Sequence, residues 1–285
     1  MEFKNIFFCL TVILICTAVS FPQDTRIADD NAMTNELWKD GIKYEAKRAI
    51  VWAEKGSLTE QEIEEFAALV NQGIVDIEKY TGIKFDKKHY QAEKIEYFIS
   101  PNAGIPHVSV DGKPYIYLKP RRVKNKNVPY IHETTHVIAF KNEKSLWLQE
   151  GFASHAETYV AAHYGGWTSA GDTFNPDSKP NEELARNHLK EEISKRILPL
   201  IGMNGTPLIF KDEEWKIYSF IFEDNKVAAP AFYHLSESFV KFFLEKVGMK
   251  KMRKLFEAQD TRAGILKITG KNVDEWKADW LKSLT

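Results

Sequence analysis

The residues His132-Glu133-Thr134-Thr135-His136, followed by the run Trp147-Leu148-Gln149-Glu150-Gly151-Phe152-Ala153, are the most informative part of this chain. Positions i and i+4 of a helix lie one turn apart on the same face, so the imidazoles of His132 and His136 would project together. Zinc accepts imidazole nitrogens at about 2.0–2.1 Å and prefers a tetrahedral shell of four ligands. Two histidines leave that shell incomplete, and Glu150 is the candidate third ligand.

A pattern as short as His-Glu-x-x-His also arises by chance, and the histidines would then be ordinary core or surface residues without a metal. The surroundings favour a metal site. Pro129 suits the first turn of a helix, and apolar residues on both sides of the motif suit a buried helix. Small residues after Glu150, such as Gly151 and Ala153, allow a second helix to approach closely. We therefore predict one zinc ion in this region.

Composition bounds the class of protein. A length of 285 residues allows one or two domains. A hydrophobic content of 44% with 28% charged residues is typical of soluble globular proteins. The formal net charge of −1 gives no electrostatic reason to expect nucleic acid or anionic lipid as a partner.

Residues 1–20 have the pattern of a secretory signal peptide. Lys4 precedes an uncharged apolar stretch, and small residues around Ser20 indicate cleavage after that position. The stretch is short for a membrane span, although an uncleaved anchor is the alternative interpretation. Cys9 and Cys16 both lie within it, so the mature chain would contain no disulfide. This combination predicts a secreted or periplasmic bacterial protein without stable membrane insertion after cleavage.

The remaining pattern predicts an α+β protein. Residues 22–33 are polar and suggest an irregular lead-in, whereas residues 34–55 suggest a helix. Thr59-Glu60-Gln61-Glu62 has the form of a capping box, which predicts a helix that ends near Gly82.

A small sheet should follow this helix. Residues 95–99 alternate as in a strand, and residues 107–118 suggest a β-hairpin with Asp111-Gly112 as a type I′ turn. Beyond residue 145 the chain is expected to be almost wholly helical, at 145–163, 181–197, 229–247, 249–257 and 272–283. We predict a single domain over residues 21–285. Its helix-and-sheet lobe would span 21–127, its mainly helical lobe 128–285, and the metal would lie at the cleft between them.

The two motifs resemble those of the gluzincin metallopeptidases, and in particular of the compact bacterial peptidase MA-like domains, in which a short spacer also precedes Trp-Leu-x-Glu-Gly. The stretch from Tyr233 to Gly248 and the C-terminal stretch from Thr269 to Trp280 also resemble segments of those domains. The likeness covers the chain from about residue 93 to the C-terminus. It implies a zincin-like fold with the active-site helix at the cleft.

The resemblance also implies roles for individual residues. His132, His136 and Glu150 would be the zinc ligands, and Glu133 the general base. Tyr233 matches a tyrosine that helps to stabilise the oxyanion, with a packed aromatic as the alternative. His234 competes with Tyr233 for that role.

Glu150, Ser154 and Glu157 share one helical face. From there Glu157 could accept the far N–H of a zinc-bound imidazole, or it could be an ordinary surface carboxylate. His155 points to another face and is not expected to be a ligand. His107 would lie in a strand whose edge could pair with an extended peptide.

Two departures from the family narrow the expected function. The spacer from His136 to Glu150 is shorter than in the aminopeptidases and in thermolysin. We also find no Gly-x-Met-Glu-Asn run, the aminopeptidase element that grips a free N-terminus. The sequence thus predicts an exported zinc peptidase that acts on peptide or protein substrates, as an endopeptidase. A catalytically inert binding module on the same scaffold and a zinc hydrolase of non-peptide amide linkages are the alternatives.

Overall fold

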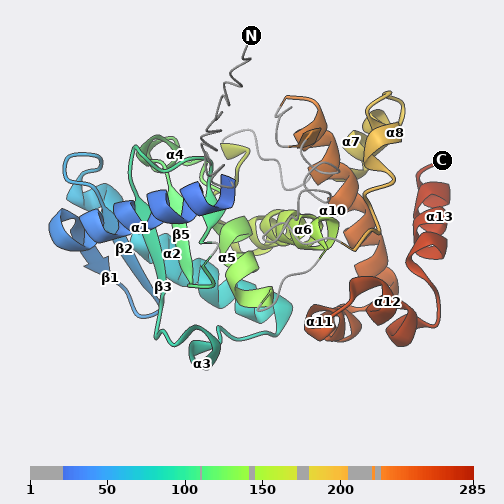
Figure 1. Ribbon diagram of the computed structural model, residues 1–285, viewed down its shortest axis with the longest axis horizontal. Coiled ribbons are helices and arrows are strands. Elements are labelled where there is room, and N and C mark those ends of the chain that lie inside the picture. The colour runs from blue at the N-terminus through green and yellow to red at the C-terminus, as the bar shows by residue number, and fades with distance from the viewer. Residues whose placement is uncertain (1–21, 110, 141–144, 172–179, 205–219, 222–225) are drawn as a thin grey trace, which may run out of the picture.

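A computed structural model describes residues 22–109, 111–140, 145–171, 180–204, 220–221 and 226–285. The proposed signal peptide lies outside the described residues. Within them the protein is α+β, as predicted, with one small mixed sheet and a mostly helical remainder (Figure 1). No described helix is both long and apolar enough to cross a membrane.

The sheet has five strands in the order β1-β2-β3-β5-β4. The central pairs, β2 with β3 and β3 with β5, are parallel, and the two outer pairs are antiparallel. The strands are β1 (Ile42–Glu45), β2 (Ala49–Ala53), β3 (Ile95–Ile99), β4 (His107–Val108) and β5 (Tyr115–Leu118).

Two helices cover the two faces of this sheet, α1 (Pro22–Asp40) and α2 (Glu60–Thr81) (Figure 1). Side chains alternate along β3, so Tyr97 joins the core under α2, and Phe98 packs with the core under α1. The predicted capping box of α2 is confirmed at Thr59, and Gly82 ends the helix in the left-handed region with φ 66°.

The prediction of one helix over residues 34–55 was wrong, as was the irregular lead-in at 22–33. Residues 22–40 form α1, and the chain then forms the antiparallel pair β1 and β2. The burial of β2 alternates residue by residue, which is the period of a strand. Pairing of β2 with β3, a segment distant in sequence, therefore outweighs the local helical pattern.

The predicted strand at 95–99 and the hairpin that precedes the metal-site helix are confirmed, but the turn differs. Val108 pairs with Ile116, and the backbone N–H of Ser109 donates to the carbonyl of Tyr115. This register places an odd number of residues between the paired positions, so a two-residue turn centred on Asp111-Gly112 does not connect the strands.

The helical remainder largely follows the prediction. The segment expected as one helix over 181–197 is divided into α7 and α8, and α12 was not predicted. The helices are α3 (Lys87–Tyr90), α4 (Pro120–Lys124), α5 (Tyr130–Ala139), α6 (Leu146–Tyr164), α7 (Pro180–Leu189), α8 (Ser194–Ile197), α10 (Ala228–Val247), α11 (Met249–Glu257), α12 (Thr261–Thr269) and α13 (Val273–Leu284).

Two large apolar cores meet at α6. Phe152 and the other buried residues of its first half pack with α10, α11 and α13, whereas Val160 near its end belongs to the core of the sheet. Most of α5 also packs into the sheet core, through residues such as Ile131 and Val137. The helix that carries the histidine motif is thus held on the sheet side, and α6 joins it to the helical side.

Candidate metal centre

Helices α5 and α6 position the donor side chains. The His-Glu-x-x-His motif lies within α5, which begins directly after Pro129. The hydroxyls of Thr134 and Thr135 donate to carbonyls one turn back in the helix, and that of Thr134 also lies 2.6 Å from the hydroxyl of Tyr97 on β3. These buried contacts direct both threonines into the sheet core, which leaves the face with His132 and His136 turned towards α6.

Three donor atoms converge between the two helices. The Nε2 atoms of His132 and His136 are 3.1 Å apart, and Oε2 of Glu150 lies 3.1 Å from the first and 3.7 Å from the second. The three side chains are 12%, 14% and 15% exposed, so the site is recessed but reaches solvent.

The spacing of the three donors fits a metal ion. Two ligands at about 2.0–2.1 Å from zinc in a tetrahedral shell are separated by about 3.3–3.4 Å. The donor separations of 3.1, 3.1 and 3.7 Å bracket that value. His132, His136 and Glu150 therefore form a group that could hold a metal ion.

Charge accumulates around these donors in a way that favours a cation. Burial on its own lowers the pKa of His132, but the hydrogen bond with Glu150 and the negative charge of Glu133 raise it to about 9. Burial opposes ionisation of Glu150 as well, yet the two histidines hold its pKa well below the usual range. The site thus retains its carboxylate and stabilises positive charge at the imidazoles.

Glu133 is buried on α5 directly beside His132 and is not one of the three converging donors. Its charge nevertheless acts on the site, since it raises the pKa of both His132 and Tyr233. A carboxylate in this position flanks the metal-binding group without entering it, which is the placement expected of a proton acceptor.

Tyr233, on α10, is brought to the site. Its ring centroid lies 6.2 Å from that of His132. The charge of Glu150, burial and the charge of Glu133 together raise the tyrosine pKa well above its ordinary value, with Arg26 of α1 opposing them. The phenol therefore keeps its proton at neutral pH and can donate a hydrogen bond.

His234 is engaged elsewhere. Its Nδ1 lies 3.0 Å from Nε2 of His188, and Nδ1 of His188 lies 3.0 Å from a carboxylate oxygen of Glu191. The two rings are nearly coplanar, at 21°, with centroids 5.2 Å apart, which is the geometry of an in-line N–H···N hydrogen bond.

This chain of contacts fixes how His234 can act. Nδ1 of His234 is occupied by the contact with Nε2 of His188, whichever of the two nitrogens carries the proton. Burial and the charge of His188 lower the pKa of His234 to about 4, so its ring is neutral at neutral pH. His234 is thus held by His188, and Tyr233, whose ring centroid lies 6.2 Å from that of His132, is the better placed of the two to donate a hydrogen bond at the site.

Glu157 is buried on α6, and its carboxylate accepts hydrogen bonds from Ser169, in the segment after that helix. One carboxylate oxygen accepts from the backbone N–H of Ser169 at 2.8 Å, and the other from the Ser169 hydroxyl at 3.2 Å. Burial raises the pKa of Glu157, and the charge of His132 opposes this. Glu157 is thus electrostatically coupled to the donor group, and Ser169 fixes its orientation.

Several residues near the site carried no recognisable signal in the sequence. His188 and Arg26 belong to no motif, and Glu237 became notable only because it is buried, with Oε1 3.1 Å from the hydroxyl of Thr158. The alternation of polar and apolar residues cannot reveal such groups, since each of them acts through a partner distant in sequence.

The other histidines singled out in the sequence are not part of the donor group. Nε2 of His107 lies 3.1 Å from a carboxylate oxygen of Asp30 on α1, a contact that ties the edge strand β4 to α1. His155 is half-buried beside aromatic rings such as that of Tyr80, and desolvation lowers its pKa to about 4. Trp147 and Phe152 lie in the apolar core.

The chain matches no protein-family model, and no curated protein is significantly similar to it in sequence. Fold and site together define an α+β protein whose two adjacent helices present a group of two imidazoles and one carboxylate suited to a metal ion.

Proposed function

We propose that this protein is an exported zinc metallopeptidase of the gluzincin type, with a zincin-like fold, that cleaves within peptide chains. The observation that carries this proposal is the convergence of His132, His136 and Glu150 beside the buried carboxylate of Glu133. The export signal read from residues 1–20 and the motif likeness support the cellular location and the family, respectively.

Zinc suits the donor set best. Two imidazole nitrogens and one carboxylate oxygen are a combination found in catalytic zinc sites, whereas calcium and magnesium prefer shells made of oxygen alone. Three protein donors also leave one tetrahedral position for water, which distinguishes catalytic from structural zinc sites. Bound zinc would lower the pKa of that water and polarise the scissile carbonyl.

The chain's own residues would divide the remaining work. Glu133 would accept the proton of the attacking water and pass it to the leaving amine. The Tyr233 hydroxyl, which keeps its proton because of the carboxylates nearby, would donate to the carbonyl oxygen as negative charge develops there. Glu157 and Ser169 would hold the electrostatic environment of His132 in place.

The test combines metal analysis with peptide cleavage. Purified protein should hold about one zinc per chain, and Glu133→Gln should keep the zinc while hydrolysis of a peptide library, read by mass spectrometry, falls by at least about 10²-fold. Glu36→Gln, an exposed glutamate on α1, is the matched control and should cleave normally.

The outcomes separate the proposal from its alternatives. Full activity in Glu133→Gln would refute the assigned mechanism, and loss of zinc in that variant would show that Glu133 is a ligand. Zinc bound without turnover of any peptide would favour an inert binding module, and turnover of a non-peptide amide alone would favour the other hydrolase class. Cleavage only at substrate ends would overturn the endopeptidase assignment.

A further inference from the structure

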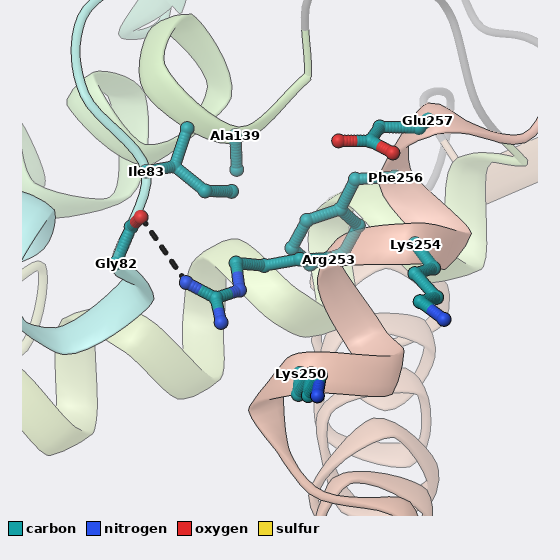
Figure 2. Close-up of a pocket in the computed structure, with 8 residues that line it drawn as sticks. All are labelled: Gly82, Ile83, Ala139, Lys250, Arg253, Lys254, Phe256 and Glu257. Carbon is teal, nitrogen blue, oxygen red and sulfur yellow. Dashed lines mark hydrogen bonds between the residues drawn. The ribbon is translucent and has the colours of Figure 1, made fainter.

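A hollow of about 520 Å³ lies apart from the donor group, between α11 and the C-terminal ends of α2 and α5 (Figure 2). Its volume falls within the range of about 300–1,000 Å³ that is usual for small-molecule sites. Ile83, Ala139 and Phe256 give it apolar walls, while Lys250, Arg253 and Lys254 project from α11. The hollow thus combines an apolar surface with a concentration of positive charge.

Three of the four charged residues that line this hollow are cations. Lys250, Arg253 and Lys254 form no ion pair in the described part of the chain, and Glu257 is the single acidic residue of the lining. Other cations of the helical half do have carboxylate partners, as Lys241 does with Glu245 at 2.6 Å. In a chain of net charge −1, α11 has four basic residues and one acidic residue.

Arg253 is half-buried, whereas Lys250 and Lys254 are exposed. Its Nη1 donates to the carbonyl of Gly82 at 3.2 Å, and Figure 2 shows the side chain reaching across from α11 to that residue. A Cβ at position 82 would collide with the guanidinium, so glycine makes room for it. The rest of the guanidinium has no hydrogen-bond partner among the described residues and remains available as a planar fork for an anion.

The position of Lys250 is unfavourable for α11 itself. Lys250 lies in the first turn of the helix, which contains no acidic residue. The positive end of the helix dipole repels cations there, so an acidic or neutral residue would be the more stable choice. A ligand that brings negative charge to the hollow would remove this repulsion.

We propose that the hollow binds a small organic phosphate. The phosphate group would lie against the free edge of Arg253, with Lys250 and Lys254 of the same helix adding to the positive potential, and the organic part would pack on Ile83 and Phe256. Charge-assisted bonds from a guanidinium fork recognise the phosphate oxygens, while the apolar wall distinguishes an organic ester from the inorganic ion. This inference is independent of the proposed peptidase activity.

Calorimetric titration with phenyl phosphate tests the proposal. The wild-type protein should bind it saturably with a Kd below about 1 mM, and phenol should not bind. Inorganic phosphate should bind several-fold more weakly, because it lacks the ring. Citrate tests whether the site prefers a polycarboxylate to a phosphate ester, and it should also bind more weakly than phenyl phosphate.

Charge variants locate the site. Arg253→Gln should weaken phenyl phosphate binding about tenfold or more, as expected for loss of a charge-assisted pair, and Lys254→Gln should weaken it to a smaller degree. Glu257→Gln should tighten it, because a repelling carboxylate is removed. Lys251→Gln is the matched control, since Lys251 is exposed on the same helix but does not line the hollow.

Several results would overturn the inference. The first is that no anion binds saturably. The second is that Lys251→Gln and Lys254→Gln weaken phenyl phosphate binding equally. The third is that inorganic phosphate and phenyl phosphate bind with equal affinity. Tighter binding of citrate would replace the phosphate by a polycarboxylate. Far-ultraviolet circular dichroism checks that each variant is folded, and Lys254→Gln decides the question if Arg253→Gln is not.

Discussion

Glu237, buried in α10 next to the metal centre, makes the stability of the protein depend on pH in a defined direction. Burial raises its pKa to about 8, with the charge of Glu157 adding to the effect and the Thr158 hydroxyl opposing it. In the unfolded chain the pKa of this carboxyl lies near its ordinary value of 4.5. Between these two values the native state holds a proton that the unfolded state releases, so stability must fall as pH rises from about 4.5 to about 8.

The size of this effect follows from the same values. Each pH unit within the window costs about 1.4 kcal/mol, so from pH 5 to pH 7.5 the wild-type protein should lose about 3 kcal/mol through Glu237. Glu237→Gln replaces the carboxyl by a neutral amide of the same shape and removes this dependence. Relative to wild type, the variant should therefore gain about 3 kcal/mol of unfolding free energy over that interval.

Urea unfolding at pH 5 and pH 7.5, followed by circular dichroism in the presence of a chelator, measures this difference. The chelator keeps bound metal from contributing its own pH dependence. Glu36→Gln, an exposed change on α1, should run parallel to wild type and serves as the control. If the gap between Glu237→Gln and wild type is the same at both pH values, Glu237 is ionised in the native state and the reasoning is refuted.

Three further predictions concern the site and its supports. Tyr233→Phe should lower kcat about 10²–10³-fold with little change in zinc content or KM, as measured by steady-state peptide cleavage; an unchanged kcat would remove the tyrosine from the mechanism. Gly151→Ala places a Cβ 2.5 Å from the Ser236 carbonyl oxygen where α6 crosses α10, and overpacking of about 1–3 kcal/mol should exceed the helix gain of about 1 kcal/mol. A urea midpoint at or above the wild-type value would contradict this. Zinc at about 100 times its Kd should stabilise the metal-free protein by about 2.7 kcal/mol. In thermal unfolding, the rise in Tm caused by zinc should be smaller in Glu150→Gln than in wild type. An equal rise in Tm in that variant would argue against Glu150 as a zinc ligand.

The local parts of the fold were predictable because their signals lie within a few residues of one another. The capping box at Thr59 specified where α2 begins, and Gly82 specified where it ends. The spacing of His132 and His136 sufficed to predict that their rings meet, because helical geometry fixes the relation of i to i+4.

Features that depend on distant partners were not predictable in the same way. Residues 42–53 have apolar side chains compatible with either a helix or strands, and only pairing with β3 decides between them. Likewise His234 looked like a donor for the active site until its pairing with His188, 46 positions away in sequence, became visible. Neither outcome can be derived from periodicity, since both depend on which segments lie side by side.

The order in which the site assembles follows from where its donors lie in the chain. His132 and Glu150, 18 positions apart, belong to consecutive helices, whereas Tyr233 comes from a helix much later in the sequence. Closing a short loop costs little conformational entropy, so the three donors can meet while much of the chain is still unfolded. Zinc added during refolding should therefore act as an early nucleus that draws α5 and α6 together. The docking of α10, which brings Tyr233, would then be the step that turns a metal-binding intermediate into a complete site.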